Sequence, residues 1–309
     1  MINKNIIMTG DWHIQMENPS SRIDDYKLAL ESKTDQLLNA CLRLNADLVM
    51  PGDMFSKVQT DNEFIIYNLK LLKKFKENDV KVIAVFGNHD VYRTQAELED
   101  KTPLKILEEA GLVKILRRGD TIEYNNLKIY GFGYYDELTP ALKEDNGIKH
   151  MAIIHKFYQQ SQYKEFNIQY NKLEELGYDF ALCGHDHIAY ETDIRPYCTV
   201  FRPGALMRGT VHDYNFTRGV FFIYLNTENF KSEMVQLNVR PMSEVMAETK
   251  VIEKIEKQEM DFKEYTKSME NVINKEKDYN NLTEIEKRIL NKDGYTNESK
   301  NLLIEIIKD

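Results

Sequence analysis

The chain has 309 residues, of which 42% are hydrophobic, and it includes 18 tyrosines and 14 phenylalanines. This is enough to build one large domain with an appendage, or two modest domains, and it argues against a disordered chain. The net charge of −9 argues against a protein that coats nucleic acid through bulk positive charge, but not against an enzyme with a carboxylate-rich metal site that acts on DNA.

The three cysteines, Cys41, Cys183 and Cys198, include no close-spaced pair, which argues against a disulfide framework or a thiolate zinc site. The amino-terminal apolar run is too short for a secretory signal peptide. No apolar stretch approaches the roughly 20 residues that a membrane-spanning helix needs. We therefore expect a soluble, cytoplasmic protein without a membrane partner.

Three short apolar runs, rich in branched side chains, predict buried strands in the first part of the chain. These runs are residues 5–10, 47–51 and 81–86. Between them, residues 34–44 and 64–75 carry apolar side chains at helical spacing, whereas residues 14–32 are polar and predict a long loop. The resulting β-α-β-α-β order predicts parallel strands with right-handed crossovers.

Beyond residue 100 the predicted elements are shorter. A helix is expected at residues 103–109, where Pro103 favours its start and Gly111 its end, and further helices at 136–144 and 172–176. The strands predicted here are residues 112–116, 121–124, 127–133, 151–154, 180–183, 188–193, 197–201, 219–225 and 233–239. We assign the last four to a second sheet, and a two-sheet sandwich flanked by helices accommodates the whole set.

The composition changes after Pro241, where the chain becomes rich in charge. We therefore divide it into a domain of residues 1–241 and a charged helical tail of residues 242–309. Each predicted tail helix has one apolar face, and Thr283 with Glu286 forms a capping box. Such a face must be buried, either on the chain's own domain as a cap or on a partner, and its periodicity does not decide between them.

Five apolar runs end in His, Asp or Asn, often next to a glycine that lets the backbone turn. The clearest is residues 81–90, KVIAVFGNHD, which presents Asn88, His89 and Asp90 in sequence. The others are IIMTGDWH at 6–13, LVMPGDMF at 48–55, MAIIH at 151–155 and FALCGHDH at 180–187. Ligands of open α/β sheets bind at the carboxyl ends of the strands, so we expect these side chains to converge.

Seven side chains from these motifs form a candidate ligand set: Asp11, His13, Asp53, Asn88, His155, His185 and His187. Mixed imidazole and oxygen ligation suits manganese, the expected ion, with iron, zinc or nickel as alternatives. Seven ligands are too many for one ion and suit two divalent ions that share a carboxylate, for which Asp53 is the natural choice. The remaining histidines, His150 and His212, are interpreted as structural.

The ordered motif set resembles the calcineurin-like metallophosphoesterase superfamily. It comprises Asp11-x-His13, Gly52-Asp53, Gly87-Asn88-His89-Asp90, His155 and Gly184-His185-x-His187. The resemblance spans residues 6–187 and implies an α/β fold, a four-layer α/β/β/α sandwich of two mixed β-sheets with a dinuclear site. In this chain a helical C-terminal appendage would follow.

The same resemblance implies roles for the motif residues. One ion would be held by Asp11, His13, Asp53 and His187, and the other by Asp53, Asn88, His155 and His185. His89 would be catalytic, because it would stabilise the scissile phosphate and assist the leaving oxygen. Asp90 would orient the His89 ring, which suits a general acid near neutral pH.

Segments outside the metal motifs are similar to SbcD-type DNA repair nucleases over about residues 1–241. They are residues 89–93, residues 103–113, the turn Arg202-Pro203-Gly204, and residues 218–222 and 239–241. This similarity implies a bacterial or phage-encoded DNA exo/endonuclease that works in repair or recombination with an SbcC-like coiled-coil ATPase, bound through the C-terminal helices. Two alternatives stay open: a small-molecule or cyclic-nucleotide phosphodiesterase or phosphatase, and a non-catalytic scaffold.

Contact with DNA would need basic residues near the site. The candidates in or near strand-end loops are Arg22, Lys156, Arg202, Arg208 and Arg218. Each is equally well explained as an ordinary solvated charge, because phosphate contacts carry no short motif. A homodimer is also left open.

Overall fold

The computed structural model describes residues 2–58, 60–92, 96–143, 147–159, 167–209, 219–246, 289–291 and 300. The chain divides into two compact units, Met1–Val245 and Met246–Asp309. All elements named below belong to the first unit. The helices expected beyond residue 246 lie outside the described residues, apart from residues 289–291 and 300.

The first sheet has six strands in the order β14-β13-β1-β2-β3-β4. They are β1 (Asn5–Met8), β2 (Ala46–Met50), β3 (Val82–Ala84), β4 (Lys114–Ile115), β13 (Phe221–Leu225) and β14 (Ser232–Gln236). Strands β1 to β4 run parallel, as the predicted β-α-β-α-β order requires, whereas β13 and β14 are antiparallel to their neighbours. The sheet is therefore mixed.

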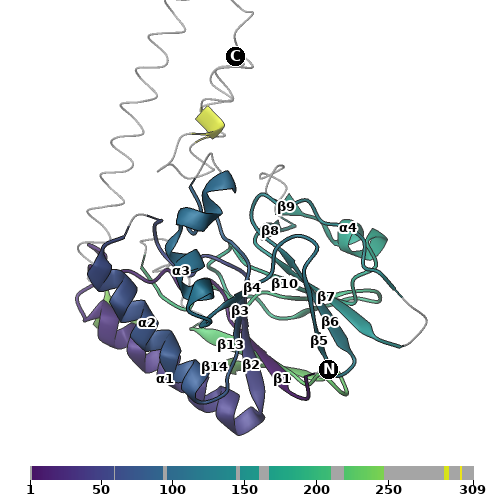
Figure 1. Cartoon of the computed structure of the whole chain (residues 1–309), viewed down its shortest axis with the longest axis horizontal. Coiled ribbons are helices and arrows are strands. Elements are labelled where there is room, and N and C mark those ends of the chain that lie inside the picture. Colours follow the sequence, from purple (N-terminus) through teal and green to yellow (C-terminus); the bar gives the residue numbers. More distant parts are fainter. Residues whose placement is uncertain are drawn as a thin grey trace, which may run out of the picture. The chain divides into compact units, whose positions relative to one another are not determined.

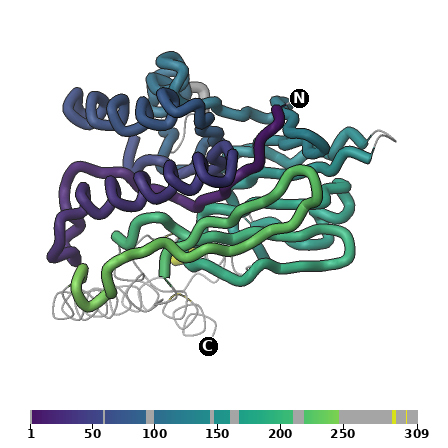
Figure 2. Tube along the Cα trace, turned by 90° about the horizontal axis from the view of Figure 1, so that it is seen from below, coloured from purple at the N-terminus to yellow at the C-terminus, as the bar shows by residue number. Residues whose placement is uncertain are grey.

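The assignment of residues 219–225 and 233–239 to the second sheet is wrong. These segments form β13 and β14, and β13 pairs with β1, with Ile6 opposite Leu225. This pairing hydrogen-bonds the edge of β1 that would otherwise be open. Figure 2 shows the green hairpin of β13 and β14 beside the purple amino-terminal strand.

The second sheet also has six strands, in the order β11-β12-β10-β7-β6-β5. They are β5 (Thr121–Tyr124), β6 (Leu127–Phe132), β7 (Lys149–Ile154), β10 (Phe180–Cys183), β11 (Asp193–Ile194) and β12 (Thr199–Phe201). The four inner strands are parallel and the two edge strands antiparallel. A separate parallel pair is formed by β8 (Phe157–Tyr158) and β9 (Asn167–Ile168).

The described helices are mostly short connections between these strands. They are α1 (Tyr26–Leu44), α2 (Asn62–Glu77), the 3₁₀ helix η1 (Ala96–Lys101), α3 (Pro103–Glu109), α4 (Tyr170–Glu175) and α5 (Met242–Val245). Helix α1 begins inside the stretch that was expected to be a loop, because the Asp25 carboxylate accepts the Leu28 N–H at 3.0 Å and caps it. The helix expected at 136–144 is absent from residues 136–143, where Pro140 disfavours helical backbone at Thr139.

Neighbouring side chains of the central strands face two different cores. Ile7 and Met50 pack with the helices, whereas Ile6, Met8 and Val49 pack between the two sheets. This alternation follows from the two-residue period of a strand. Parallel strands covered on both faces are shielded from solvent along their length, and all five residues of β2 are buried, including the hydrogen-bonded Asp47.

The layers follow from these cores. Figure 1 shows α1 and α2 side by side against one face of the first sheet, and the second sheet lies on the opposite face. A third core, which includes Leu173 of α4, covers the outer face of the second sheet. The chain is thus an α/β protein with two mixed six-stranded sheets packed face to face, as expected.

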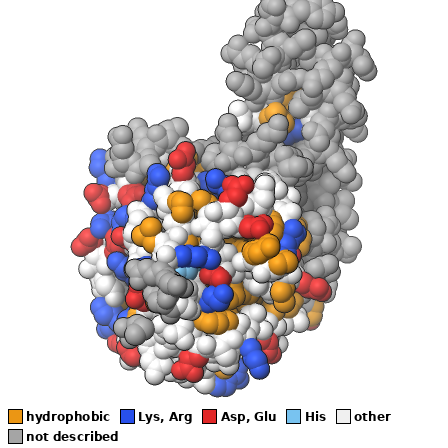
Figure 3. Space-filling model, turned by 90° about the vertical axis from the view of Figure 1, so that its right-hand side faces the viewer, with side chains coloured by type: hydrophobic (Ala, Val, Ile, Leu, Met, Phe, Trp, Pro, Cys, Tyr) orange, Lys and Arg blue, Asp and Glu red, His pale blue; other side chains and the backbone are white. Residues whose placement is uncertain are grey.

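The surface agrees with the expectations from composition. On the face in Figure 3, basic and acidic side chains are interspersed among hydrophobic ones, and a histidine reaches the surface beside basic side chains. All three cysteines are free and buried, so they form no disulfide. Within the described residues, no helix is both long enough and apolar enough to cross a membrane.

Candidate metal centre

The five strand-end motifs come together in the structure. Asp11 and His13 follow β1, Asp53 follows β2, Asn88 follows β3, His155 follows β7, and His185 and His187 follow β10. The first three strands belong to one sheet and the last two to the other, so the site spans the carboxyl ends of both sheets.

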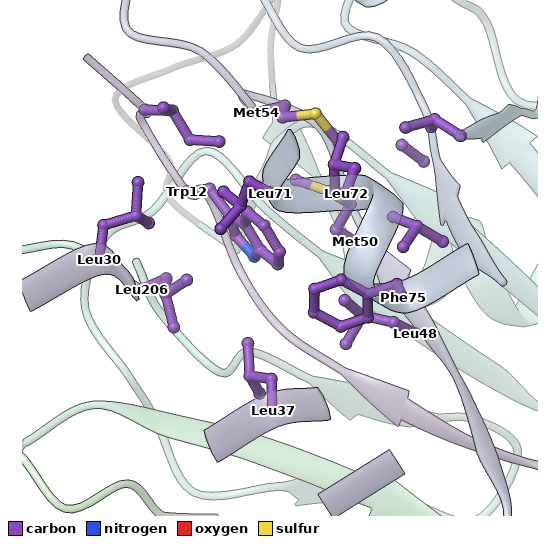
Figure 4. Packing of buried hydrophobic residues seen from close by; sticks show 14 of the residues in the cluster. Trp12, Leu30, Leu37, Leu48, Met50, Met54, Leu71, Leu72, Phe75 and Leu206 are labelled. Atoms are coloured by element: carbon purple, nitrogen blue, oxygen red, sulfur yellow. The ribbon is translucent and has the colours of Figure 1, made fainter. Parts of the chain in front are cut away.

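Trp12 separates the first two of these residues and points the other way. It is fully buried in the helix-side core, its Nε1 donates to Thr9 Oγ1 at 2.8 Å, and its ring lies 6.4 Å from that of Phe75. Figure 4 shows it beside Leu71 of α2. The i, i+2 spacing therefore turns Asp11 and His13 toward the site and Trp12 into the core, as the motif predicts.

The first cluster consists of Asp11, His13 and His187, each of which offers a ligand atom within 4.8 Å of the others. The two imidazole Nε2 atoms lie 2.9 Å apart. Asp11 Oδ2 accepts the His185 N–H at 3.0 Å, but its Oδ1 is buried with no hydrogen-bond partner. A buried carboxylate oxygen without a donor is costly unless a cation binds it, so this cluster fits a metal ion.

The second cluster consists of Asp53, His155 and His185. His155 Nε2 lies 3.2 Å from Asp53 Oδ2 and 3.0 Å from Asn88 Oδ1. Its Nδ1 lies 2.7 Å from the Pro51 carbonyl oxygen. A carbonyl at this position places the ring proton on Nδ1 and leaves Nε2 as the metal-binding nitrogen, which is the usual arrangement behind a histidine ligand.

Asp53 connects the two clusters. Its Oδ2 lies 3.2 Å from His155 Nε2 and 3.8 Å from His13 Nε2, so one oxygen faces a histidine of each cluster. Its Oδ1 accepts the backbone N–H of His89 at 2.8 Å, which fixes the orientation of the carboxylate. From this position Asp53 could serve as a ligand common to both clusters.

The backbone at the site is strained. His13, Asp53 and His185 have φ angles of 48°, 47° and 73°, in a region that non-glycine residues rarely adopt. Such strain persists where the surrounding structure enforces it, and it is commonest at functional sites. Gly87 is required for a different reason, which is space: a Cβ atom there would lie 2.0 Å from Asp53 Oδ1.

In the first cluster, burial is the largest influence on the pKa of Asp11 and on that of His13. It raises the pKa of Asp11 to about 7, and burial together with the neighbouring His187 lowers the pKa of His13 to about 3. A neutral imidazole is the form that binds a metal ion. The donor set of carboxylate, imidazole and amide atoms thus fits two divalent ions.

In the second cluster, the pKa values of Asp53 and His155 are shifted in opposite directions. Burial acts to raise the pKa of Asp53, but His155 outweighs it and holds that pKa well below its usual range. Burial acts to lower the pKa of His155, but Asp53 and Asp11 raise it to about 9. Burial also lowers the pKa of His185, which favours its neutral, metal-binding form.

His89 and Asp90 differ from the expected arrangement. Asp90 does not hold the His89 ring, because its carboxylate accepts the backbone N–H groups of Met54, Phe55 and Gly87 at 3.0–3.3 Å. The His89 Nδ1 instead lies 2.8 Å from the Ser56 carbonyl oxygen. The His89 side chain is exposed, whereas Asp90 is fully buried. The Asp90 carboxylate therefore links the loops that follow β2 and β3.

Aromatic side chains next to the second cluster were not found from the sequence. The Phe157 and Tyr134 rings lie 4.2 and 5.2 Å from the His185 ring, and Tyr134 also contacts His155. Neither residue belongs to a motif. The sequence indicated only that Phe157 follows His155 closely in the chain, which is a weak sign that it lies near the site. Of the two remaining histidines, His150 lies 3.0 Å from the Tyr130 hydroxyl in the second sheet, and His212 lies outside the described residues.

Several archaeal proteins, each named "DNA double-strand break repair protein Mre11", are distant relatives of this chain. The one from Sulfolobus acidocaldarius is 27% identical over 34% of this chain and 27% of its own length. Those from Methanocaldococcus jannaschii and Archaeoglobus fulgidus are 26% and 23% identical over 53% and 81% of this chain, and 47% and 62% of their own lengths. The chain thus spans from about a quarter to just under two thirds of these relatives.

A family model described as "Calcineurin-like phosphoesterase" matches residues 4–189, which is more than half of the chain. The match contains both clusters and all five strand-end motifs. The chain therefore belongs to the calcineurin-like phosphoesterase family.

Proposed function

We propose that this protein is a two-metal phosphodiesterase that hydrolyses DNA. The observation that carries the two-metal part is the Asp53 carboxylate, one oxygen of which faces His13 of one cluster and His155 of the other. The preference for DNA is supported by the relatives, whose names state a role in DNA double-strand break repair.

The two ions would be held by the side chains predicted from the motifs. Asp11, His13, Asp53 and His187 would bind one manganese ion, and Asp53, Asn88, His155 and His185 would bind the other. When bound, such a pair supplies a water of lowered pKa and neutralises phosphoryl charge during in-line attack. The protein's part is to hold these ligands in place. The strained backbone at His13, Asp53 and His185 supports this role, because such strain persists only where the surrounding structure enforces it.

His89 would act on the leaving group. Its Nδ1 is engaged by the Ser56 carbonyl, so its Nε2 is the nitrogen left to meet the phosphate. The exposed position of the ring is consistent with contact to a substrate. A protonated Nε2 would stabilise negative charge on the phosphoryl group and then donate its proton to the departing oxygen.

The partner is part of the proposal. We place the nuclease domain in residues 1–241 and assign residues 242–309 to binding an SbcC-like coiled-coil ATPase. The support is the one-sided apolar periodicity of the tail sequence. Co-purification of full-length protein with such an ATPase, lost when the apolar positions Ile285 and Ile289 are changed to Asp, tests this assignment.

The function is tested by a substrate panel. We expect manganese-dependent degradation of linear duplex DNA by the wild type, and at least a 100-fold loss in Asn88→Ala. Cyclic nucleotides and p-nitrophenyl phosphate esters serve as comparison substrates. If only these small esters are hydrolysed, the protein is a small-molecule phosphoesterase and the DNA assignment is wrong.

A further inference from the structure

Arg202, which follows β12, has a guanidinium group enclosed by aromatic rings. Its Cζ lies 3.9 Å from the centre of the Tyr190 ring and 5.1 Å from that of Tyr158. Its Nε is buried and makes no hydrogen bond, while the residue as a whole keeps partial solvent exposure. The rings restrict the rotamers of a long side chain, so the planar fork is held in place before any ligand arrives.

The guanidinium also forms no ion pair with any described carboxylate. Asp193 is close enough to interact with it electrostatically. However, both oxygens of Asp193 accept from Arg195 Nε at 3.0 Å, and one also accepts from the Tyr158 hydroxyl at 2.9 Å. The acid nearby is thus already engaged, and Arg202 keeps its charge and its donors for another anion.

Three other described arginines also stack on an aromatic ring, but each of them has a carboxylate partner. Arg22 binds Asp24, Arg117 binds Glu108, and Arg195 binds Asp193, each at 3.0 Å or less. Each of these guanidinium groups is neutralised by its own ion pair. Of this stacked set in the described chain, Arg202 alone lacks a carboxylate partner.

The other predicted DNA contacts are less suited to the task. Arg22 is nearly buried and also donates to the Arg208 carbonyl at 2.7 Å. The buried Lys156 donates to the Tyr134 carbonyl at 2.8 Å. Arg208 donates to the Arg240 carbonyl at 2.7 Å, and residue 218 lies outside the described residues.

The backbone ties Arg202 to the metal centre. Its carbonyl accepts the Tyr190 N–H at 3.0 Å, and three residues later the Ala205 N–H donates to the His187 carbonyl at 3.0 Å. Between them, Gly204 packs so closely that a Cβ atom would lie 2.8 Å from the same His187 oxygen. Tyr158, which lies against the guanidinium, follows His155 by three residues. The segment that carries Arg202 is thus hydrogen-bonded to His187, and its ring partner Tyr158 lies on the segment that carries His155.

We propose that Arg202 binds a backbone phosphate of the DNA next to the phosphate that is cleaved. This inference rests on the proposed function, because it assigns part of the substrate of the same site. A chain with a net charge of −9, whose face in Figure 3 carries basic and acidic side chains interspersed, gains little from bulk attraction to DNA. A single preorganised guanidinium can supply the bidentate contact instead.

The test is the salt dependence of DNA binding, measured by fluorescence anisotropy of a labelled 20-mer duplex in EDTA. Loss of one phosphate contact should reduce the slope of log K against log salt by about 1 in Arg202→Ala. Arg202→Lys retains the charge and should keep most of the slope. Arg117→Ala is the matched control, because that arginine stacks on Phe86 but is already paired with Glu108, and its slope should match the wild type.

A second readout separates binding from folding. With manganese, the ratio of kcat/KM on the duplex to kcat/KM on bis(p-nitrophenyl) phosphate should fall about tenfold in Arg202→Ala. An equal loss on both substrates, or an unchanged salt slope, overturns the phosphate site. If the wild type binds but does not cleave the duplex while the slope still falls in Arg202→Ala, the nuclease assignment is wrong and the phosphate site stands.

Discussion

The Nδ1 atom of His89 lies 2.8 Å from the carbonyl oxygen of Ser56. A backbone carbonyl therefore orients this ring, and no side chain of the motif does. The ring is exposed and belongs to neither cluster of the described residues, although it lies 5.1 Å from the His13 ring, and this separates it from the histidines of the two clusters.

His89→Ala should keep two metal ions per chain and lose at least about 100-fold in kcat on DNA, because it removes a proton donor and not a ligand. Metal content after dialysis and single-turnover cleavage measure the two quantities. Asn88→Ala is the comparison, since its Oδ1 lies 3.0 Å from His155 Nε2 and its loss should reduce metal content as well. Loss of metal in His89→Ala would place His89 among the ligands instead.

Asp90→Ala should destabilise the fold. The carboxylate accepts three buried backbone N–H groups, and leaving them without acceptors costs about 3–5 kcal/mol in the free energy of unfolding. A melting temperature roughly 10 °C below the wild type is expected for a domain of this size. Asp100→Ala, at an exposed position, should melt like the wild type. Normal melting of Asp90→Ala with lost turnover would restore a direct role in catalysis.

Tyr124→Phe should weaken the packing of the two sheets at the end away from the site. The Tyr124 hydroxyl in the second sheet donates to Asp47 Oδ2 in the first at 2.8 Å, and Asp47 is fully buried. Removing this donor from a buried carboxylate should cost about 1–3 kcal/mol in urea unfolding. Turnover per folded molecule should stay at the wild-type value. A change in turnover larger than the change in folded fraction would contradict this division of roles.

Glu108→Gln should reduce stability at neutral pH more than in acid. Its bidentate hydrogen bonds to Arg117, both 2.9 Å, lower the pKa of Glu108 from 4.5 to about 2. A lowered folded-state pKa gives stability that is complete above pH 4.5 and lost as the pH falls through about 2. The gap between wild-type and Glu108→Gln melting temperatures should therefore shrink across that window. Glu109→Gln, on the same helix and 71% exposed, should show a smaller gap throughout. A gap for Glu108→Gln that does not change with pH would contradict the linkage.

The strand ends could be predicted from the sequence because their signal is local. An apolar run followed by Gly-Asp or Gly-Asn-His-Asp reports both a buried strand and the polar residues at its end. The partners of His89 and Asp90 could not be predicted, because they are backbone groups of the loops after β2 and β3, which no side-chain motif encodes.

The remaining errors in the fold predicted from the sequence have similar causes. The pairing of β13 with β1 joins residues that lie far apart in the chain, and the local pattern of β13 fits either sheet equally well. The start of α1 at Tyr26 depends on the Asp25 cap, which was hidden in a run of charged residues. The carboxylate that links the two clusters, Asp53, was the natural choice from its place after a central strand, but its distances required the structure.

The central claim is that two metal ions share Asp53, and manganese stoichiometry tests it most directly. Isothermal titration of metal-free wild type should give two Mn²⁺ per chain. Asp53→Ala should weaken both sites together, because it removes a ligand common to both ions. A single Mn²⁺ in the wild type, or two Mn²⁺ bound with unchanged affinity in Asp53→Ala, would contradict the claim.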